Sequence, residues 1–213
     1  MRFLRWRVKR QLTGVVDIQA ARAALERPYR GPLPADIRIT PSDGPVPGEW
    51  VVSTHAAADA PVLMYLHGGG YFACSPETHR PVTMAFARGG QLRVFVPRYR
   101  RAPEHRFPAA IEDAVACCDW IAASTGRPVA AIAGESAGGG LTLSTLLRLR
   151  DSGRRLPMAA VAFSAVTDLA ATGDSLVSND RKDAMVHGAS VARLPEVYLP
   201  DGVPPTDPLA SPL

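Results

Sequence analysis

Ser136 lies between two glycines, with one residue on either side, in a segment that reads GESAG. The pattern G-x-S-x-G here directly follows an apolar run and directly precedes a stretch with helical spacing. In that setting the serine occupies a strained turn from strand to helix, and side chains in place of Gly134 and Gly138 would crowd the backbones that pass each other. We predict that Ser136 is a nucleophile. The alternative is a glycine-rich turn that only joins a strand to a helix.

The residue that follows the serine adds to this chemistry. Attack of a hydroxyl group on a carbonyl carbon produces a tetrahedral oxyanion, which is stabilised by preorganised hydrogen-bond donors. Ala137 begins a helix predicted over residues 137–150, so its backbone N–H and the helix dipole would both stabilise that charge. We therefore predict Ala137 to be one donor of an oxyanion hole.

Three consecutive glycines lie upstream, in the segment HGGGYF at residues 67–72, directly after a short apolar run. Residues without side chains can turn their N–H groups outward from a loop. We predict that Gly68 and Gly69 complete the oxyanion hole together with Ala137.

The nearby histidines and the cysteines have structural interpretations. We interpret His67 as an organiser of the glycine loop rather than a base, and His79 as part of a helix start that precedes Ser136 in the chain. Cys117 and Cys118 are adjacent within a helical pattern, which indicates neither a disulfide framework nor a metal site. No metal or cofactor is predicted.

The elements that must position these residues follow from the apolar pattern. Four continuous apolar runs alternate with segments of helical length, and they lie at residues 62–66, 92–96, 129–133 and 159–163. Continuous hydrophobicity indicates strands covered on both faces, so we predict an α/β fold with a mostly parallel, doubly wound sheet. The short runs at residues 37–40 and 49–53 indicate an antiparallel hairpin at the sheet edge. Apolar residues at helical spacing indicate a helix over residues 109–123, directly after Pro108.

Several blocks of the sequence carry a family resemblance. They are LMYLHGGGYFACSPETH (63–79), YRRAPEHRFPAAIEDA (99–114), SAVTDL (164–169) and DPLASPL (207–213). Together with the serine segment they resemble the bacterial hormone-sensitive-lipase family of HGGG and GxSxG esterases, which have the α/β-hydrolase fold. The resemblance extends from about Asp36 to the C-terminus, and Glu135 stands where many members have aspartate.

The resemblance implies a single α/β-hydrolase domain over residues 1–213 and a carboxylesterase or lactone hydrolase. Such an enzyme would hydrolyse short or medium acyl esters or lactones through an acyl-enzyme on Ser136, with a small-molecule substrate and no cofactor. Two alternatives stay open. One is a small-molecule binder that keeps the pocket without turnover, and the other is a truncated gene product without a folded function.

The acid and the base of the family follow the serine, each after a further strand. DPLASPL normally lies just before the strand that leads to the acid, so the chain resembles a C-terminally truncated member. It would lack two strand-helix units, about 60 residues at roughly 30 per unit, which leaves its activity open. Asp168 and His187 are the available acid and base, because His187 is the only histidine C-terminal to Ser136. The family resemblance favours structural roles for both, so this triad is the minor alternative.

The resemblance also implies lid segments at residues 1–35 and about 168–201, which flank the sheet where related esterases build a lid. Phe3, Trp6 and Tyr198 are candidates to line an acyl pocket there. Packing of the two lid segments against each other is an equal alternative for each of these side chains.

Truncation would also change the edge of the sheet. The strand at residues 159–163, internal in a complete sheet, would become an exposed apolar edge. Such edges aggregate or pair with another chain, so we predict a homo-oligomer formed through this edge.

The charge of the chain bears on nucleic-acid and membrane binding. The net charge is +4 and the pI about 9.2, with the densest basic stretch in the first ten residues. No nucleic-acid motif follows that stretch, so we interpret it as a solvated helix face or an interfacial anchor and predict no nucleic-acid partner. No apolar run approaches a membrane span or a signal-peptide core, and we expect a cytoplasmic protein without a transmembrane segment.

Overall fold

The computed structural model describes residues 17–183 and 186–213. The basic stretch of the first ten residues, together with Phe3 and Trp6, lies outside the described residues. The described part of the 1–35 segment consists of α2 (Ile18–Leu25) and the residues on either side of it. Among the described residues, no helix is long and apolar enough to cross a membrane.

Six strands form one mixed sheet in the order β1-β2-β4-β3-β5-β6. Their bounds are β1 (Ile37–Ser42), β2 (Gly48–Ser53), β3 (Val62–Leu66), β4 (Arg93–Pro97), β5 (Ala131–Glu135) and β6 (Ala159–Phe163). The hairpin β1–β2 is antiparallel and joins β4 antiparallel, whereas β3 pairs parallel with β4 and β5, and β5 pairs parallel with β6. The predicted mostly parallel sheet with an edge hairpin is confirmed.

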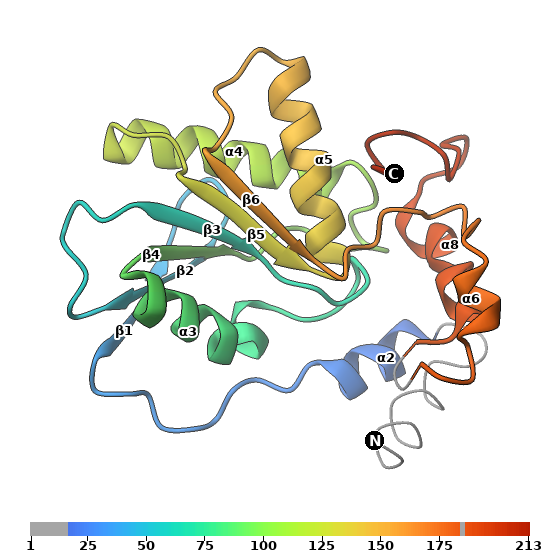
Figure 1. The fold of residues 1–213 in the computed structure, drawn as a ribbon, viewed down its shortest axis with the longest axis horizontal. Coiled ribbons are helices and arrows are strands. Elements are labelled where there is room, and N and C mark those ends of the chain that lie inside the picture. The colour runs from blue at the N-terminus through green and yellow to red at the C-terminus, as the bar shows by residue number, and fades with distance from the viewer. Residues whose placement is uncertain (1–16, 184–185) are drawn as a thin grey trace.

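Helices cover the sheet on both faces, as a doubly wound fold requires (Figure 1). The main ones are α3 (Arg80–Gly90) on one face and α4 (Ala109–Thr125) and α5 (Ala137–Asp151) on the other, with the short η2 (Pro76–His79) leading into α3. The predicted helix behind Pro108 is confirmed as α4, which ends at Gly126 in the left-handed conformation. Three short helices follow β6: α6 (Ser175–Ser178), α7 (Gly188–Val191) and α8 (Leu194–Tyr198).

The core has two layers, one on each face of the sheet. In β3 all five residues are buried; Met64 and Leu66 belong to the layer beneath α4 and α5, whereas Leu63 and Tyr65 belong to the layer beneath α3. Alternate side chains of one strand thus enter opposite layers, which explains why the apolar run is continuous rather than alternating.

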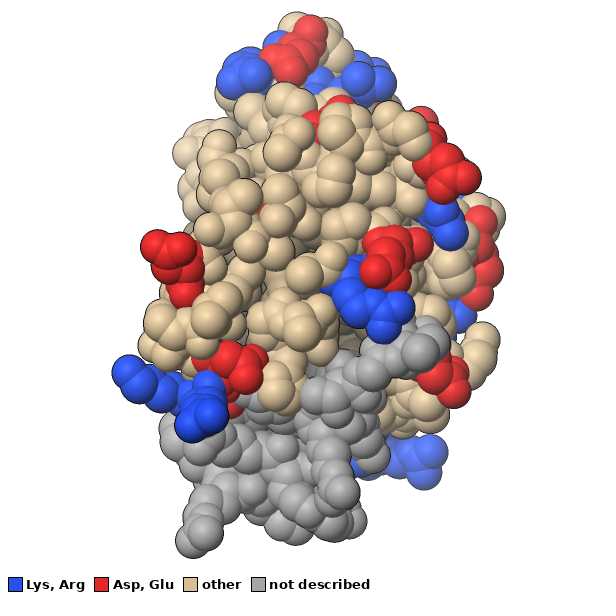
Figure 2. Space-filling view, turned by 90° about the vertical axis from the view of Figure 1, so that its right-hand side faces the viewer, with Lys and Arg blue, Asp and Glu red and all other residues tan. Residues whose placement is uncertain are grey.

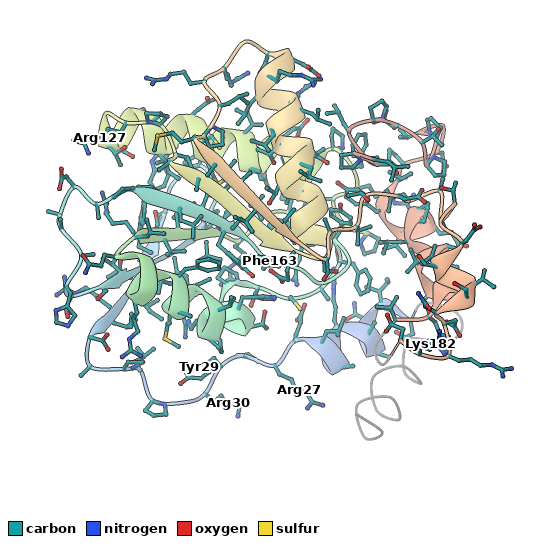
Figure 3. All side chains as sticks on the ribbon, in the orientation of Figure 1. Arg27, Tyr29, Arg30, Arg127, Phe163 and Lys182 are labelled. Carbon is teal, nitrogen blue, oxygen red and sulfur yellow. The ribbon has the colours of Figure 1, made fainter. Side chains whose placement is uncertain are left out.

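The last strand, β6, lies at the edge of the sheet, and all five of its residues are exposed. Val161 and Phe163 are 43% and 46% exposed. Phe163 points to the α3 side, where its ring lies 6.4 Å from that of Phe86 (Figure 3). The predicted exposed apolar edge is confirmed in the described residues.

The cysteines are core residues, as predicted. Cys74, Cys117 and Cys118 are all free and buried. Burial raises the pKa of the Cys74 thiol to about 11 and that of Cys118 to about 12. The thiols therefore stay protonated at neutral pH.

Candidate active site

Ser136 occupies the turn between β5 and α5 with φ 54° and ψ −123°, a conformation that residues with side chains rarely adopt. The backbone around it is fixed from two directions. The Ser136 N–H donates to the carbonyl oxygen of Phe163 at 2.9 Å, and the Ser136 carbonyl accepts from the N–H groups of Gly140 and Val166 at 3.1 and 3.0 Å. The strained turn is therefore held by β6, by the loop after β6 and by the first turn of α5.

The two glycines of the serine motif allow close passage of backbones, as predicted. A Cβ atom on Gly134 would lie 2.3 Å from the carbonyl oxygen of Gly138. A Cβ atom on Gly138 would lie 2.0 Å from the carbonyl oxygen of Leu66, at the end of β3. The serine turn and the end of β3 are thus in direct contact, which leaves no room for a side chain at either position.

The glycine loop begins where β3 ends and turns sharply. Gly69 and Gly70 have φ of 111° and 63°. The carbonyl oxygen of Gly69 accepts from the N–H groups of Phe72 and Ala73 at 3.1 and 2.8 Å, which closes the turn. A Cβ atom on the preceding Gly68 would lie 3.2 Å from the Cβ of Ser136, so the loop and the serine are adjacent.

Glu135 joins these two segments. Its Oε1 accepts from the Gly68 N–H and lies 2.7 Å from His79 Nε2, while its Oε2 accepts from the Tyr65 hydroxyl. Burial alone would raise the pKa of this carboxyl, but the bonds from His79, Tyr65 and Gly68 lower it below its ordinary value. An ionised carboxylate thus ties the serine turn to β3, to η2 and to the start of the glycine loop.

The contact to Glu135 corrects one expectation about the oxyanion hole. The Gly68 N–H is not available to a substrate oxygen, because it is already donated to the carboxylate. The N–H groups of Gly69, Gly70 and Ala137 donate to no protein acceptor within the described part of the chain. Gly70 therefore replaces Gly68 as a candidate donor, beside Gly69 and Ala137.

His67 is fully buried behind the glycine loop. Its Nδ1 lies 2.8 Å from the Gly68 carbonyl, which can only accept, so Nδ1 carries the proton. The ring stacks on Tyr99 at 4.3 Å, and the Tyr99 hydroxyl donates to the His67 carbonyl at 2.6 Å. Burial lowers the pKa of His67 to about 3, so the ring is neutral at physiological pH. These contacts support the interpretation of His67 as a loop organiser.

Comparison with known proteins places the chain in a family. Residues 63–213 match the model of a family with the alpha/beta hydrolase fold. A crystal structure of an esterase from the bacterial hormone-sensitive lipase family has 35% identity and a TM-score of 0.85 over 99% of this chain and 72% of that one. The chain belongs to the bacterial hormone-sensitive lipase family. The crystal structure of EstE5 is similar as well, with 32% identity and a TM-score of 0.89 over 99% of this chain and 71% of that one.

A curated relative is an acetyl-hydrolase from Streptomyces hygroscopicus, which is 39% identical over 182 residues. The match takes in 83% of this chain and 60% of that enzyme. The chain thus spans about three fifths of the length of this relative.

The structure does not bring the two sequence candidates for acid and base together. Asp168 accepts from the N–H and hydroxyl groups of Thr172 at 2.7 and 2.8 Å. His187 Nδ1 instead lies 2.9 Å from Asp180 Oδ1. Across residues 17–183 and 186–213, no hydrogen bond links either candidate to Ser136.

Tyr198 packs within the protein rather than lining an open pocket. Its side chain is 2% exposed and stacks on Tyr71 of the glycine loop, with ring centroids 3.9 Å apart. Its carbonyl accepts from the Phe107 N–H at 2.9 Å. The 168–201 segment is thereby attached to the loop, and Figure 1 shows α6 and α8 beside the sheet end to which β5 and β6 point.

Sequence reasoning missed the contribution of Glu135, which it treated as a tolerated difference from aspartate. A signal was present, because a carboxylate between a buried strand and a buried helix must find donors. His79 was interpreted as structural, but its partner Glu135 could not be inferred from the sequence, because the two residues are far apart in the chain.

Proposed function

We propose that this chain is a serine hydrolase of carboxylic esters, acting on short or medium acyl esters or lactones through an acyl-enzyme on Ser136. The observation that supports this most is the strained turn at Ser136, next to the glycine loop, together with the N–H groups of Gly69, Gly70 and Ala137, which have no acceptor among the described residues. The acetyl-hydrolase relative points to small acyl groups.

In this reaction the Ser136 oxygen attacks the ester carbonyl carbon while a base takes the hydroxyl proton. The carbonyl oxygen becomes an oxyanion that accepts hydrogen bonds from the Gly69, Gly70 and Ala137 N–H groups. Collapse of the tetrahedral intermediate expels the alcohol, which receives the proton, and water then hydrolyses the acyl-serine by the same steps. The partial positive charge at the N-terminus of α5, which begins at Ala137, adds to the stabilisation of the oxyanion.

The base is the open part of this proposal. One candidate is His187, which would have to leave Asp180 and reach Ser136, with Asp168 as the acid. The other is a base supplied by a second chain. A specific observation favours a second function: within the described residues no imidazole hydrogen-bonds Ser136. A chain with this serine turn and glycine loop but no base would bind small esters without hydrolysing them.

The test is hydrolysis of p-nitrophenyl acetate and butyrate by the purified chain, by Ser136→Ala and by His187→Ala. Turnover that is lost in Ser136→Ala supports the hydrolase, and loss in His187→Ala as well assigns the base. Equal background rates in all three proteins would refute the hydrolase. Equilibrium dialysis that recovers bound, intact p-nitrophenyl butyrate would then support the binder.

A further inference from the structure

Two arginines bind carbonyl groups on the outer side of the glycine loop. Arg22 of α2 donates from Nε to the carbonyl oxygen of Phe72 at 2.7 Å. Arg101 donates from Nη1 to the carbonyl oxygen of Cys74 at 2.6 Å. The Arg22 side chain is only 14% exposed, so this contact is largely shielded from water.

Each arginine is held by a carboxylate from the other segment. Arg22 binds both carboxylate oxygens of Glu104 at 2.7 and 2.6 Å and also the carbonyl of Ala102 at 2.9 Å. Arg101 in turn binds Glu26, directly after α2, at 2.5 Å. The bond from Arg22 lowers the pKa of Glu104 to about 2, so this carboxylate is ionised at neutral pH. The two ion pairs therefore join α2 and the residue after it to the segment at residues 101–104.

The contact of Arg22 reaches the candidate oxyanion donors through two peptide planes. The carbonyl of Phe72 and the N–H of Ala73 belong to one planar peptide group, and that N–H donates to the Gly69 carbonyl at 2.8 Å. The Gly69 carbonyl and the Gly70 N–H belong to a second planar group. A trans peptide directs its N–H opposite to its C=O, so fixing the Gly69 carbonyl also fixes the direction of the Gly70 N–H.

The helix α2 could not hold this position by itself. It has eight residues, begins at the Asp17 cap, whose side chain accepts from the Ala20 N–H at 3.0 Å, and buries only Ala21. Isolated helices of this length are unstable in water, so α2 is ordered by what it contacts. Its contacts include the packing of Ala21, Ile18 and Leu25 on the core and the polar contacts described above, of which Arg22 makes the one to the Phe72 carbonyl.

We propose that Arg22 is a positioning residue that makes the oxyanion hole depend on α2. The guanidinium fixes the Phe72–Ala73 peptide, which fixes the Gly69–Gly70 peptide and points the Gly70 N–H at the developing oxyanion. A charged donor at the start of this series also polarises each following hydrogen bond. The inference rests on the proposed function of the loop and adds a control of that loop by the segment that precedes the sheet.

The experiment compares the wild type with Arg22→Met, which keeps an unbranched apolar side chain but removes the guanidinium and with it every donor. Arg88→Met is the matched control, because Arg88 also forms an ion pair with a carboxylate, at 2.7 Å from Asp36, but lies on α3. The first readout is hydrogen exchange at the Ala73 amide, measured by NMR. We expect Arg22→Met to raise this exchange rate about tenfold or more, because a charged hydrogen bond behind the turn is lost.

The second readout is esterase kinetics. An oxyanion contact acts in the transition state, so we expect kcat to fall about tenfold in Arg22→Met while KM stays within twofold. An Ala73 exchange rate equal to that of the wild type and of Arg88→Met would overturn the inference. The exchange readout does not require turnover, so it stays decisive even if the chain proves to have no esterase activity.

A second variant covers the case in which Arg22→Met does not fold. Glu104→Gln weakens the anchor of Arg22 but leaves the guanidinium in place, and Glu104 is half exposed, so the fold should tolerate the change. A rise of about threefold in Ala73 exchange supports the inference, since the anchor is partly lost. If Arg22→Met does not fold, an Ala73 exchange rate in Glu104→Gln that equals the wild-type rate would refute the inference.

Discussion

Replacement of Glu135 tests the network that joins the serine turn to the glycine loop. Glutamine keeps the shape of the side chain and can still accept from the Gly68 N–H and from His79 through one oxygen, while its NH₂ group faces the Tyr65 hydroxyl. The variant therefore loses the charge on three hydrogen bonds, keeps the two to Oε1, and reverses the third, in which the NH₂ group donates to the Tyr65 hydroxyl oxygen. A hydrogen bond to a charged group contributes about 1 kcal/mol more than a neutral one, or about 3 kcal/mol for the three bonds. A neutral amide is easier to bury than a carboxylate, so we expect the free energy of unfolding to fall by about 2 kcal/mol.

Glu135→Leu removes the acceptor altogether and leaves buried donors on Gly68 and Tyr65 without partners. At about 1 to 3 kcal/mol for each such group, this variant should lose about 4 kcal/mol or more. Urea unfolding measures both changes, and a loss of 2 kcal/mol shifts the midpoint by about 1 M. Glu196→Gln is the control, because Glu196 forms an exposed ion pair with Arg193, and such pairs contribute little.

The sign of the pH dependence follows from the lowered pKa of Glu135. The carboxylate stabilises the fold at any pH above the pKa it has in the unfolded chain, and this contribution is lost as the pH falls through its lower folded value. Glu135→Gln should lack that component of the acid-induced loss. Equal midpoints for the wild type, Glu135→Gln and Glu135→Leu would refute the reasoning, since a carboxylate with three real donors cannot be removed at no cost.

Two further predictions concern the buried histidine and the open sheet edge. His67 has a pKa of about 3 in the folded chain, against 6.5 in the unfolded chain. Between these values only the unfolded chain binds the proton, so the free energy of unfolding is highest above pH 6.5 and falls as the pH falls toward 3. Between pH 5 and 6, unfolding free energy measured in urea should rise by about 1.2 kcal/mol per pH unit more in the wild type than in His67→Asn, and equal slopes would contradict this. Val161→Lys on β6 should reduce self-association seen by analytical ultracentrifugation, whereas Val177→Lys, at an exposed site on α6, should not. A wild type that is monomeric at every concentration would show that the edge does not pair.

The strands were predicted well where a continuous apolar run marks the whole strand. β3 and β6 match their apolar runs at both ends. In contrast, β5 was predicted at residues 129–133 but lies at Ala131–Glu135. Its last two residues are a glycine and a glutamate, which serve the serine turn and carry no apolar signal, although they pair with Leu66 and Phe163.

The candidate site was predicted in its parts but not in its connections. Ser136 and the glycines are adjacent in short motifs, so sequence spacing suffices to find them. The partners of the loop are distant in the chain: Arg22 lies 50 residues from Phe72, and Glu135 lies 67 residues from Gly68. Which N–H of the glycine loop is left free depends on such long-range contacts, which is why the sequence assigned Gly68 where the structure favours Gly70.

The state of the three thiols bears on how this chain can be studied. Each is buried and held protonated by burial, so none will react readily with maleimide or iodoacetamide reagents under native conditions. A cysteine introduced at Val177, which is 84% exposed on α6, would therefore be the one reactive thiol in the described part of the chain. A fluorophore or spin label at that site would report on the 168–201 segment while a substrate binds, and the native cysteines would not have to be removed first.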